Sequence, residues 1–194
     1  MTRDVLIYTF ETMADWEYAH ISTVLQFQAR GGDDRFRVRF VGAAPEPVRT
    51  LGGLQVIPDA TLADIARDEI AMLVLPGGNT WADGHDAVLG LARTLIADGV
   101  PVAGICGATK AMARAGLLAH HAHVVDTDPG EEFPDYPGSA ARAHGSVAAD
   151  DPIVTAIGAA PLEFSREVFL ALGLDDQAGV DAWYAAFKDV PDAR

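Results

Sequence analysis

Cys106 is the residue of this chain best suited to covalent chemistry, and it is the only cysteine among the 194 residues. It lies in a run of small residues, Ala103–Ala108 (AGICGA), between an apolar run and a helical pattern. A sharp turn between a buried strand and a helix exposes its central side chain, as in the nucleophile elbow of serine hydrolases. The helix dipole favours a thiolate there. The sequence therefore predicts a functional Cys106 with a lowered pKa, against the alternative of a buried, inert cysteine.

Two further segments carry residues that suit the same site. Glu17 follows the expected strand Val5–Phe10, and Gly77 and Gly78 follow the apolar run Ile70–Leu75. Sites in parallel sheets gather at the carboxyl ends of the strands. Two glycines at such an end let the backbone approach a ligand or a reacting atom closely. A plain turn is the structural alternative for this glycine pair.

The histidines do not form a metal-binding pattern. The run His120–His123 (HHAH) has no acidic or cysteine ligand at a suitable spacing. We therefore expect no metal and no cofactor. His85 and His144 lie in loop-like stretches, from which the fold can bring either one near Cys106.

The elements that must position these residues alternate along the chain. Strands are expected at Val5–Phe10, Phe36–Val41, Leu54–Pro58, Ile70–Leu75, Val100–Ile105, His123–Val125 and Ile153–Ile157. Helices are expected at Asp15–Arg30, Thr61–Ala66, Asp86–Ala97, Gly107–Ala115, Leu162–Leu172 and Asp181–Lys188. This alternation predicts an α/β fold with a mainly parallel sheet and helices on both faces. Residues 126–150 are expected to be irregular, and the absence of a linker or repeat predicts a single domain over residues 1–194.

Composition excludes several classes of partner. The chain has 14 basic and 28 acidic residues, a net charge of −14, which argues against nucleic acid and against anionic membranes as partners.

The composition also bears on order and compartment. With 49% apolar residues, a disordered chain is not expected. No apolar run reaches the roughly 18 residues of a membrane span, and no signal-like N-terminus is present. A lone cysteine excludes an intramolecular disulfide, so we expect a cytoplasmic protein.

Four segments taken together resemble the DJ-1/PfpI superfamily, in the group similar to type 1 glutamine amidotransferases. The segments are Val5–Glu17, Leu73–Gly78, Val102–Ala108 and Thr155–Phe164. They occur in the family's order and spacing, so the resemblance spans nearly the whole chain. It implies a flavodoxin-like three-layer sandwich with a mainly parallel central sheet.

The resemblance also implies roles for particular residues. Cys106 matches the family's reactive cysteine, and Glu17 matches its acidic partner, usually a protonated carboxyl that donates a hydrogen bond to the sulfur. The backbone amides of Gly78 and Gly107 match the family's oxyanion-hole positions. The family further implies a homodimer, for which the exposed face of the helix at Asp15–Arg30 is a candidate contact.

The chain departs from the family's histidine patterns. Gly107 stands where PfpI-type peptidases have a histidine, and no histidine–glutamate pair of the glutamine amidotransferases is present. Many DJ-1-like members have a loop histidine at a position that Asp128 takes here. The sequence leaves three functions open: a cysteine-centred stress protein that acts on reactive carbonyls or senses an oxidant, an amidase- or peptidase-like hydrolase, and a non-catalytic binding module. The partner in each is a small-molecule substrate, an oxidant or a ligand.

Overall fold

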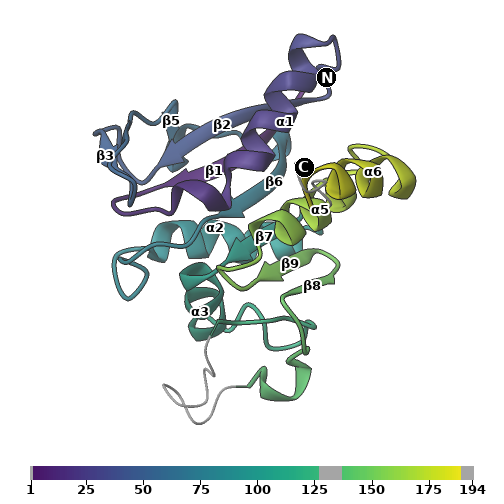
Figure 1. Cartoon of the computed structure of the whole chain (residues 1–194). Coiled ribbons are helices and arrows are strands. Elements are labelled where there is room, and N and C mark those ends of the chain that lie inside the picture. Colours follow the sequence, from purple (N-terminus) through teal and green to yellow (C-terminus); the bar gives the residue numbers. More distant parts are fainter. Residues whose placement is uncertain (1, 127–136, 189–194) are drawn as a thin grey trace.

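A seven-stranded sheet forms the centre of the protein in this computed structural model, which describes residues 2–126 and 137–188 (Figure 1). The strand order is β5-β2-β1-β6-β7-β9-β8. Every neighbouring pair is parallel except β8 and β9, which are antiparallel. The expected α/β class with a mainly parallel sheet is confirmed.

The strands and helices have the following bounds. The sheet contains β1 (Arg3–Thr9), β2 (Phe36–Gly42), β5 (Ala60–Thr61), β6 (Ile70–Leu75), β7 (Val102–Ile105), β8 (Val147–Asp150) and β9 (Ile153–Ala156). A separate antiparallel hairpin pairs β3 (Val48–Arg49) with β4 (Gln55–Val56). The α-helices are α1 (Ala19–Arg30), α2 (Asp86–Ala97), α3 (Gly107–Arg114), α5 (Pro161–Leu172) and α6 (Gln177–Lys188). Short 3₁₀ helices lie at Asp15–Glu17, Leu62–Asp64, Arg67–Glu69 and Ser139–Ala141.

Helices cover both faces of the sheet, which makes the fold a three-layer sandwich. Helices α1 and α5 contact each other on one face, with α6 packed against α5 (Figure 1). Helices α2 and α3 pack against β7 on the other face. The flavodoxin-like sandwich implied by the family resemblance is therefore confirmed.

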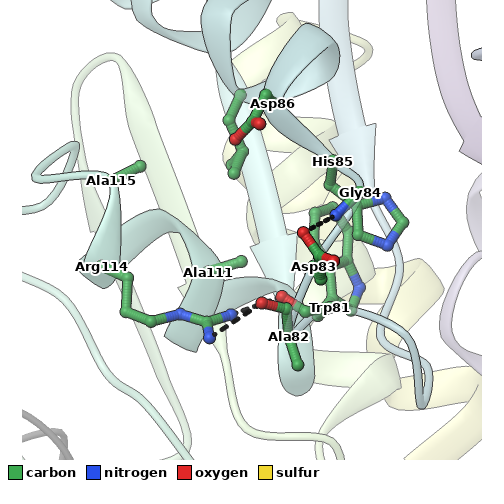
Figure 2. Close-up of a pocket in the computed structure, with 10 residues that line it drawn as sticks. Trp81, Ala82, Asp83, Gly84, His85, Asp86, Ala111, Arg114 and Ala115 are labelled. Atoms are coloured by element: carbon green, nitrogen blue, oxygen red, sulfur yellow. Dashed lines mark hydrogen bonds between the residues drawn. The ribbon is translucent and has the colours of Figure 1, made fainter.

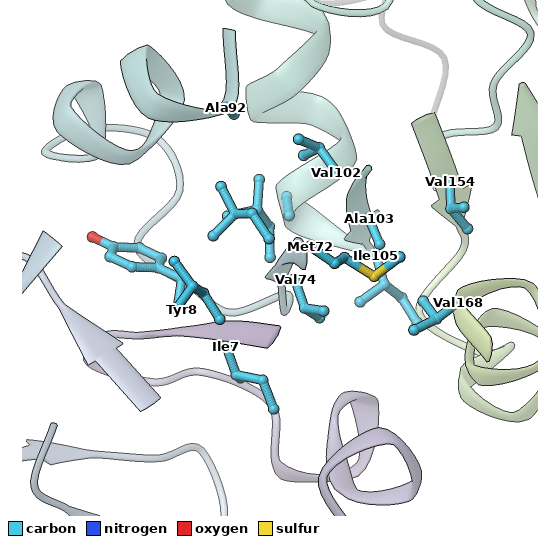
Figure 3. Packing of buried hydrophobic residues seen from close by; sticks show 14 of the residues in the cluster. Ile7, Tyr8, Met72, Val74, Ala92, Val102, Ala103, Ile105, Val154 and Val168 are labelled. Carbon is cyan, nitrogen blue, oxygen red and sulfur yellow. The ribbon is translucent and has the colours of Figure 1, made fainter. Parts of the chain in front are cut away.

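The apolar core lies on both sides of the central strands. Every residue of β6 is buried, as a central strand covered on both faces requires. In Figure 3, Ile7 and Val74 point to the same side as Val168 of α5, whereas Tyr8 points toward the opposite layer. Each fully buried aliphatic side chain contributes about 1.5–3 kcal/mol to the free energy of unfolding. The core therefore fixes β1, β6 and β7, whose ends carry the candidate site.

Three expected elements in the N-terminal half of the chain are shorter than predicted. The helix expected at Asp15–Arg30 is split into a 3₁₀ helix and α1, because the start of this segment is tied to the end of β6 through the Ala14 N–H, which donates to the Gly77 carbonyl at 2.9 Å. The strand expected at Leu54–Pro58 pairs only with β3, outside the main sheet. The helix expected at Thr61–Ala66 is one 3₁₀ turn closed by a Thr61–Asp64 capping box.

Two expectations after α3 were wrong. The predicted strand His123–Val125 makes only an isolated parallel bridge, His123 with Arg142. The stretch 126–150, expected to be irregular, contains the strand β8. Sequence patterns of four residues do not reveal such a strand, because its pairing with β9 is set by tertiary structure. Residues 127–136, between the His123–Val125 segment and β8, lie outside the residues that the structure describes.

Candidate active site

The candidate site forms where four adjacent parallel strands end. In the order β1-β6-β7-β9, each strand is followed by a segment that reaches the same edge of the sheet. Glu17 comes after β1, Gly77 and Gly78 after β6, Cys106 after β7, and Gly158 after β9. The topology thus brings Glu17, the glycine pair and Cys106 to one edge of the sheet, as the sequence predicts.

Cys106 has a backbone conformation that L-residues rarely adopt, with φ 57° and ψ −128°. Such strain persists only where surrounding contacts hold the residue in place. Here the Cys106 N–H donates to the Ala156 carbonyl at 3.0 Å, and the Cys106 carbonyl accepts from the Thr109 hydroxyl at 2.7 Å. The turn thus places the half-buried thiol at the start of α3, as the elbow pattern predicts.

Two glycines close around the thiol and leave no room for a side chain. A β-carbon on Gly77 would lie 2.6 Å from Cys106 Cβ and 2.7 Å from Glu17 Oε2. A β-carbon on Gly158 would lie 2.8 Å from Cys106 Sγ and 3.3 Å from Glu17 Oε1. Both glycines therefore contact the cysteine and the glutamate at once, and they are required for the close approach of these two side chains.

Glu17 is buried, with 1% of its surface exposed. Its Oε2 accepts a hydrogen bond of 2.5 Å from the Gly77 N–H, and its Oε1 is buried without a hydrogen-bond partner among the described residues. The pKa of Glu17 is raised from 4.5 to about 7, because the effect of burial exceeds that of the Gly77 hydrogen bond, which lowers the pKa. A carboxyl that holds its proton near neutral pH can donate toward the sulfur, as the family resemblance implies.

Asp126 is a second acidic group near the thiol, and sequence reasoning missed it. Its Oδ1 accepts a hydrogen bond of 2.8 Å from the Gly158 N–H, whose α-carbon faces Cys106 Sγ. Asp128, the residue proposed from the sequence, lies outside the described residues. The available signal was the position of Asp126 two residues earlier in the same stretch, but sequence alone does not show which carboxyl turns toward the sulfur.

The expected low pKa of Cys106 is not what this structure supports. The pKa of the Cys106 thiol is raised to about 12, first by burial and then by the carboxyl groups of Asp126 and Glu17. The Gly107 amide at the start of α3 lowers it, but by less. The sequence argument considered only the helix N-terminus, whereas burial of the thiol and two carboxyl groups outweigh its effect on the pKa here.

Gly78 and Gly107 lie side by side next to the cysteine. A β-carbon on Gly107 would lie 3.0 Å from the Gly78 carbonyl oxygen and 3.2 Å from Trp81 Cδ1. The segment that carries Gly78 is held by a backbone bridge to Met13. The two backbones are therefore close together. The oxyanion-hole role that the resemblance implies stays a prediction, and in that role the two amides would stabilise negative charge on oxygen.

His85 is engaged away from the thiol. Its Nδ1 shares a hydrogen bond of 3.1 Å with the Tyr8 hydroxyl, and its Nε2 shares one of 3.2 Å with the Thr80 hydroxyl. Burial raises the pKa of Tyr8 to about 12 and lowers the pKa of His85, so both groups are neutral. Trp81 packs on the imidazole with ring centroids 4.4 Å apart. His85 is therefore part of a buried aromatic cluster.

Two pockets lie beside this cluster. One, of about 240 Å³, is lined by residues including His85, Trp81 and Arg114, and holds no nucleophile (Figure 2). Arg114 crosses it and donates hydrogen bonds to the carbonyls of Trp81 and Ala82. The other, of about 160 Å³, is lined by Gly78 and Gly107. We assign the chemistry to the smaller pocket because it borders the cysteine turn.

Two further features of the described residues concern metal ligands and membrane-spanning helices. Among residues 2–126 and 137–188, no group of three or more histidine, cysteine or acidic side chains is placed to hold a metal ion. In the same residues, no helix is long and apolar enough to cross a membrane.

Comparisons with known proteins agree with this architecture. The sequence profile of the DJ-1/PfpI family matches residues 3–171. A curated relative named "Uncharacterized protease YoaZ" from Bacillus subtilis is 36% identical over 192 residues, covering 96% of this chain and 91% of the relative. A thiJ/pfpI family protein from Bacillus anthracis has a similar solved structure, with TM-score 0.87, 32% identity and coverage of 97% of this chain and 91% of that one. The "Glutathione-independent glyoxalase DJR-1.2" of Caenorhabditis elegans is 27% identical over 92 residues, 46% of this chain and 48% of that protein.

Proposed function

This chain belongs to the DJ-1/PfpI family, and we propose that it is a cysteine-dependent enzyme acting on small reactive carbonyl compounds such as glyoxal and methylglyoxal. One observation carries the proposal. Cys106 lies at a strained strand–helix turn, and the groups that act on its thiol are the Glu17 carboxyl, the Asp126 carboxyl and the Gly107 amide. A nucleophile with proton-carrying groups beside it is the arrangement that covalent catalysis requires.

The reaction can be written with groups that this site contains. The Cys106 sulfur bonds to the aldehyde carbon, the S–H bond breaks, and the proton ends on the carbonyl oxygen to give a hemithioacetal. The carbon-bound proton then moves to the adjacent carbon, and the hydroxyl proton of the hemithioacetal moves to the oxygen on that carbon, which gives the thioester of a 2-hydroxy acid. Water then cleaves the thioester and restores the thiol. Glu17, which holds a proton near neutral pH, is suited to these transfers.

The raised thiol pKa favours this chemistry over sensing of oxidants. Cysteines that sense peroxide are typically thiolates at neutral pH, because the thiolate is the form that is oxidised. Cys106 has its pKa raised by burial and by Glu17 and Asp126, so little thiolate is present at rest. For attack on an aldehyde bound beside it, the Cys106 thiol needs only to pass its proton to a group within the site.

Peptide hydrolysis is the second candidate, because two curated relatives from Bacillus subtilis carry the name protease. A peptidase must protonate an amine leaving group, and general acid catalysis of that step is typically worth about 10²–10⁴-fold. Gly107 has no side chain to do so, and His85 is bound to Tyr8 and Thr80. The family relative with the printed name of glyoxalase supports the carbonyl reaction instead.

The test compares turnover of methylglyoxal with cleavage of casein and of fluorogenic peptides, each measured for the wild type and Cys106→Ser. We expect formation of lactate from methylglyoxal that is lost in Cys106→Ser, and no cysteine-dependent cleavage of peptides. Cys106-dependent peptide cleavage without lactate formation would replace this function with the hydrolase. Inactivity in both assays would favour a binding module.

A further inference from the structure

Thr12 has a strained backbone in the turn that leads from β1 toward the candidate site. Its φ is 65°, and among the described residues Cys106 is the only other non-glycine residue with a positive φ. A β-branched residue is a clear outlier at such an angle. The turn is closed by the Met13 N–H, which donates to the Phe10 carbonyl at 3.3 Å, and glycine or asparagine is usual where a turn has positive φ. Strain of this kind persists where the surrounding structure holds it, and it is common at functional sites.

The hydroxyl of Thr12 binds the segment that follows β6. Its Oγ1 accepts a hydrogen bond of 3.0 Å from the Asn79 N–H. On the other side of Gly78, the Ala14 N–H donates to the Gly77 carbonyl at 2.9 Å. The segment is therefore fixed on both sides of Gly78 by groups other than the amide of Gly78 itself.

Backbone contacts also set where Gly78 lies. A β-carbon on Gly78 would lie 2.7 Å from the Thr12 carbonyl oxygen and 2.6 Å from Phe10 Cε2. The Thr12 N–H donates to the carbonyl of Arg49 in β3 at 2.7 Å, which ties the turn to the β3–β4 hairpin. Thr12 thus contacts the glycine segment through both its carbonyl group and its hydroxyl, and it is itself held by the hairpin.

The Gly78 amide needs a defined direction if it stabilises the oxygen of a substrate. Gly107, the other amide of the expected pair, lies next to it, since a β-carbon on Gly107 would lie 3.7 Å from the Gly78 nitrogen. When a sulfur attacks a carbonyl carbon, an electron pair moves to the oxygen, and donors about 2.7–3.1 Å away that already point at this oxygen stabilise its charge. A residue that fixes the Gly78 peptide therefore changes the rate without touching the substrate.

We propose that Thr12 is a positioning residue of this site: its hydroxyl and its strained backbone hold the Gly78 amide in the direction that stabilises the substrate oxygen during attack by Cys106. The proposal deepens the function proposed above and rests on it for the natural substrate. It rests on the family resemblance for the oxyanion role of Gly78 and Gly107. Glycine would relax this turn, but it has no hydroxyl to accept the Asn79 N–H.

The experiment compares two reactions of the same thiol in the wild type, Thr12→Val and Thr12→Ser, with Cys106→Ser as the background. In acylation by p-nitrophenyl acetate, the sulfur bonds to the acetyl carbon through an intermediate with a negatively charged oxygen, and p-nitrophenolate leaves. In alkylation by iodoacetamide, the sulfur bonds to a CH₂ carbon, iodide leaves, and no charged oxygen forms. The thiol proton passes to the solvent in both reactions. The ratio of the two rates at one pH therefore reports on the oxyanion amides, because changes in the reactivity of the thiol cancel.

The two variants differ in whether they keep the hydroxyl. Valine has the shape of threonine without the hydroxyl, whereas serine keeps it. We expect Thr12→Val to lower the ratio of acylation to alkylation by about tenfold or more, with the 10²–10³-fold cost of losing one oxyanion donor as the limit. Thr12→Ser should keep the ratio of the wild type. Methylglyoxal turnover should follow the same order, with kcat lowered and KM nearly unchanged, because the amide acts on the transition state.

Thr50→Val is the matched control. The Thr50 hydroxyl accepts a hydrogen bond of 2.9 Å from the Leu54 N–H within the hairpin, so this substitution removes the same kind of hydrogen bond outside the glycine segment. It should lower the free energy of unfolding and leave the ratio unchanged. An equal fall of the ratio in Thr12→Val and Thr50→Val would overturn the role of Thr12. Circular dichroism checks the fold, and Thr12→Ala, which is not β-branched and is less strained at this φ, takes the place of a Thr12→Val that does not fold.

The outcomes distinguish this proposal from the function on which it rests. Lactate formation that needs Cys106, with an unchanged ratio in Thr12→Val, overturns the role of Thr12 and leaves the function standing. A wild type that forms no lactate, with a ratio that falls in Thr12→Val and is restored in Thr12→Ser, overturns the function and supports Thr12. Acylation and alkylation that slow by the same factor in Thr12→Val leave the ratio unchanged and overturn the role of Thr12.

Discussion

Replacing Glu17 by glutamine should change how stability depends on pH, by an amount that the structure sets. Glu17 is buried between Gly77 and Gly158, and its pKa is raised from 4.5 to about 7. The folded protein thus binds this proton more tightly than the unfolded chain does. A group of this kind contributes stability below its unfolded pKa, and the contribution is lost as pH rises through the folded pKa. At about 1.4 kcal/mol per pH unit, a rise from 4.5 to about 7 corresponds to about 3 kcal/mol.

The assay is urea unfolding of the wild type and Glu17→Gln at intervals from about pH 4.5 to 8, followed by circular dichroism. Glutamine has nearly the same shape, and its carbonyl oxygen can accept the Gly77 N–H, but it does not titrate. The wild type should lose about 3 kcal/mol relative to the variant between about pH 4.5 and 7. Other titrating groups are common to both proteins and cancel in the difference.

A difference between the two proteins that does not change with pH would refute the reasoning. It would mean that Glu17 ionises in the folded protein as it does in water, which its burial contradicts. A change of opposite sign, with the wild type gaining on the variant as pH rises, would place a stabilising positive charge beside Glu17.

Three further predictions test the positions of single residues. Gly158→Ala would place a methyl group 2.8 Å from Cys106 Sγ, so thiol alkylation should slow and the free energy of unfolding should fall by about 1–3 kcal/mol. The control is Gly90→Ala in α2, where the space around the glycine is open and no loss of stability is expected. Asp4→Asn should lower the free energy of unfolding by about 2 kcal/mol in urea titrations, because Asp4 is fully buried and pairs with two arginines; an unchanged midpoint would contradict a role for these pairs. Light scattering should give the mass of a homodimer for the wild type. The side chain of Phe27 on α1 is 77% exposed, and Phe27→Ser should shift the measured mass toward the monomer. A monomeric wild type would contradict this contact.

Local patterns were sufficient for the parts of the fold that are continuous in sequence. The apolar run Ile70–Leu75 and the helical run Asp86–Ala97 have the predicted bounds, because burial on both faces and helical periodicity leave direct marks in the sequence. Strand β6 is followed by the glycine pair and strand β7 by Cys106, and the rule for parallel sheets brings these strand ends together. Cys106, Glu17 and the glycine pair were therefore within reach of sequence reasoning.

What only the tertiary structure decided depends on contacts between distant segments. Strand β8 exists because it pairs with β9, and the predicted strand at His123 is reduced to one bridge. Asp126 reaches the thiol because the Gly158 N–H, which follows another strand, holds its carboxyl group. The causes that raise the pKa of Cys106 also come from the tertiary structure. A helix N-terminus is visible in a sequence, but the burial of the thiol and the two carboxyl groups from other segments, which together outweigh its effect on the pKa, are not.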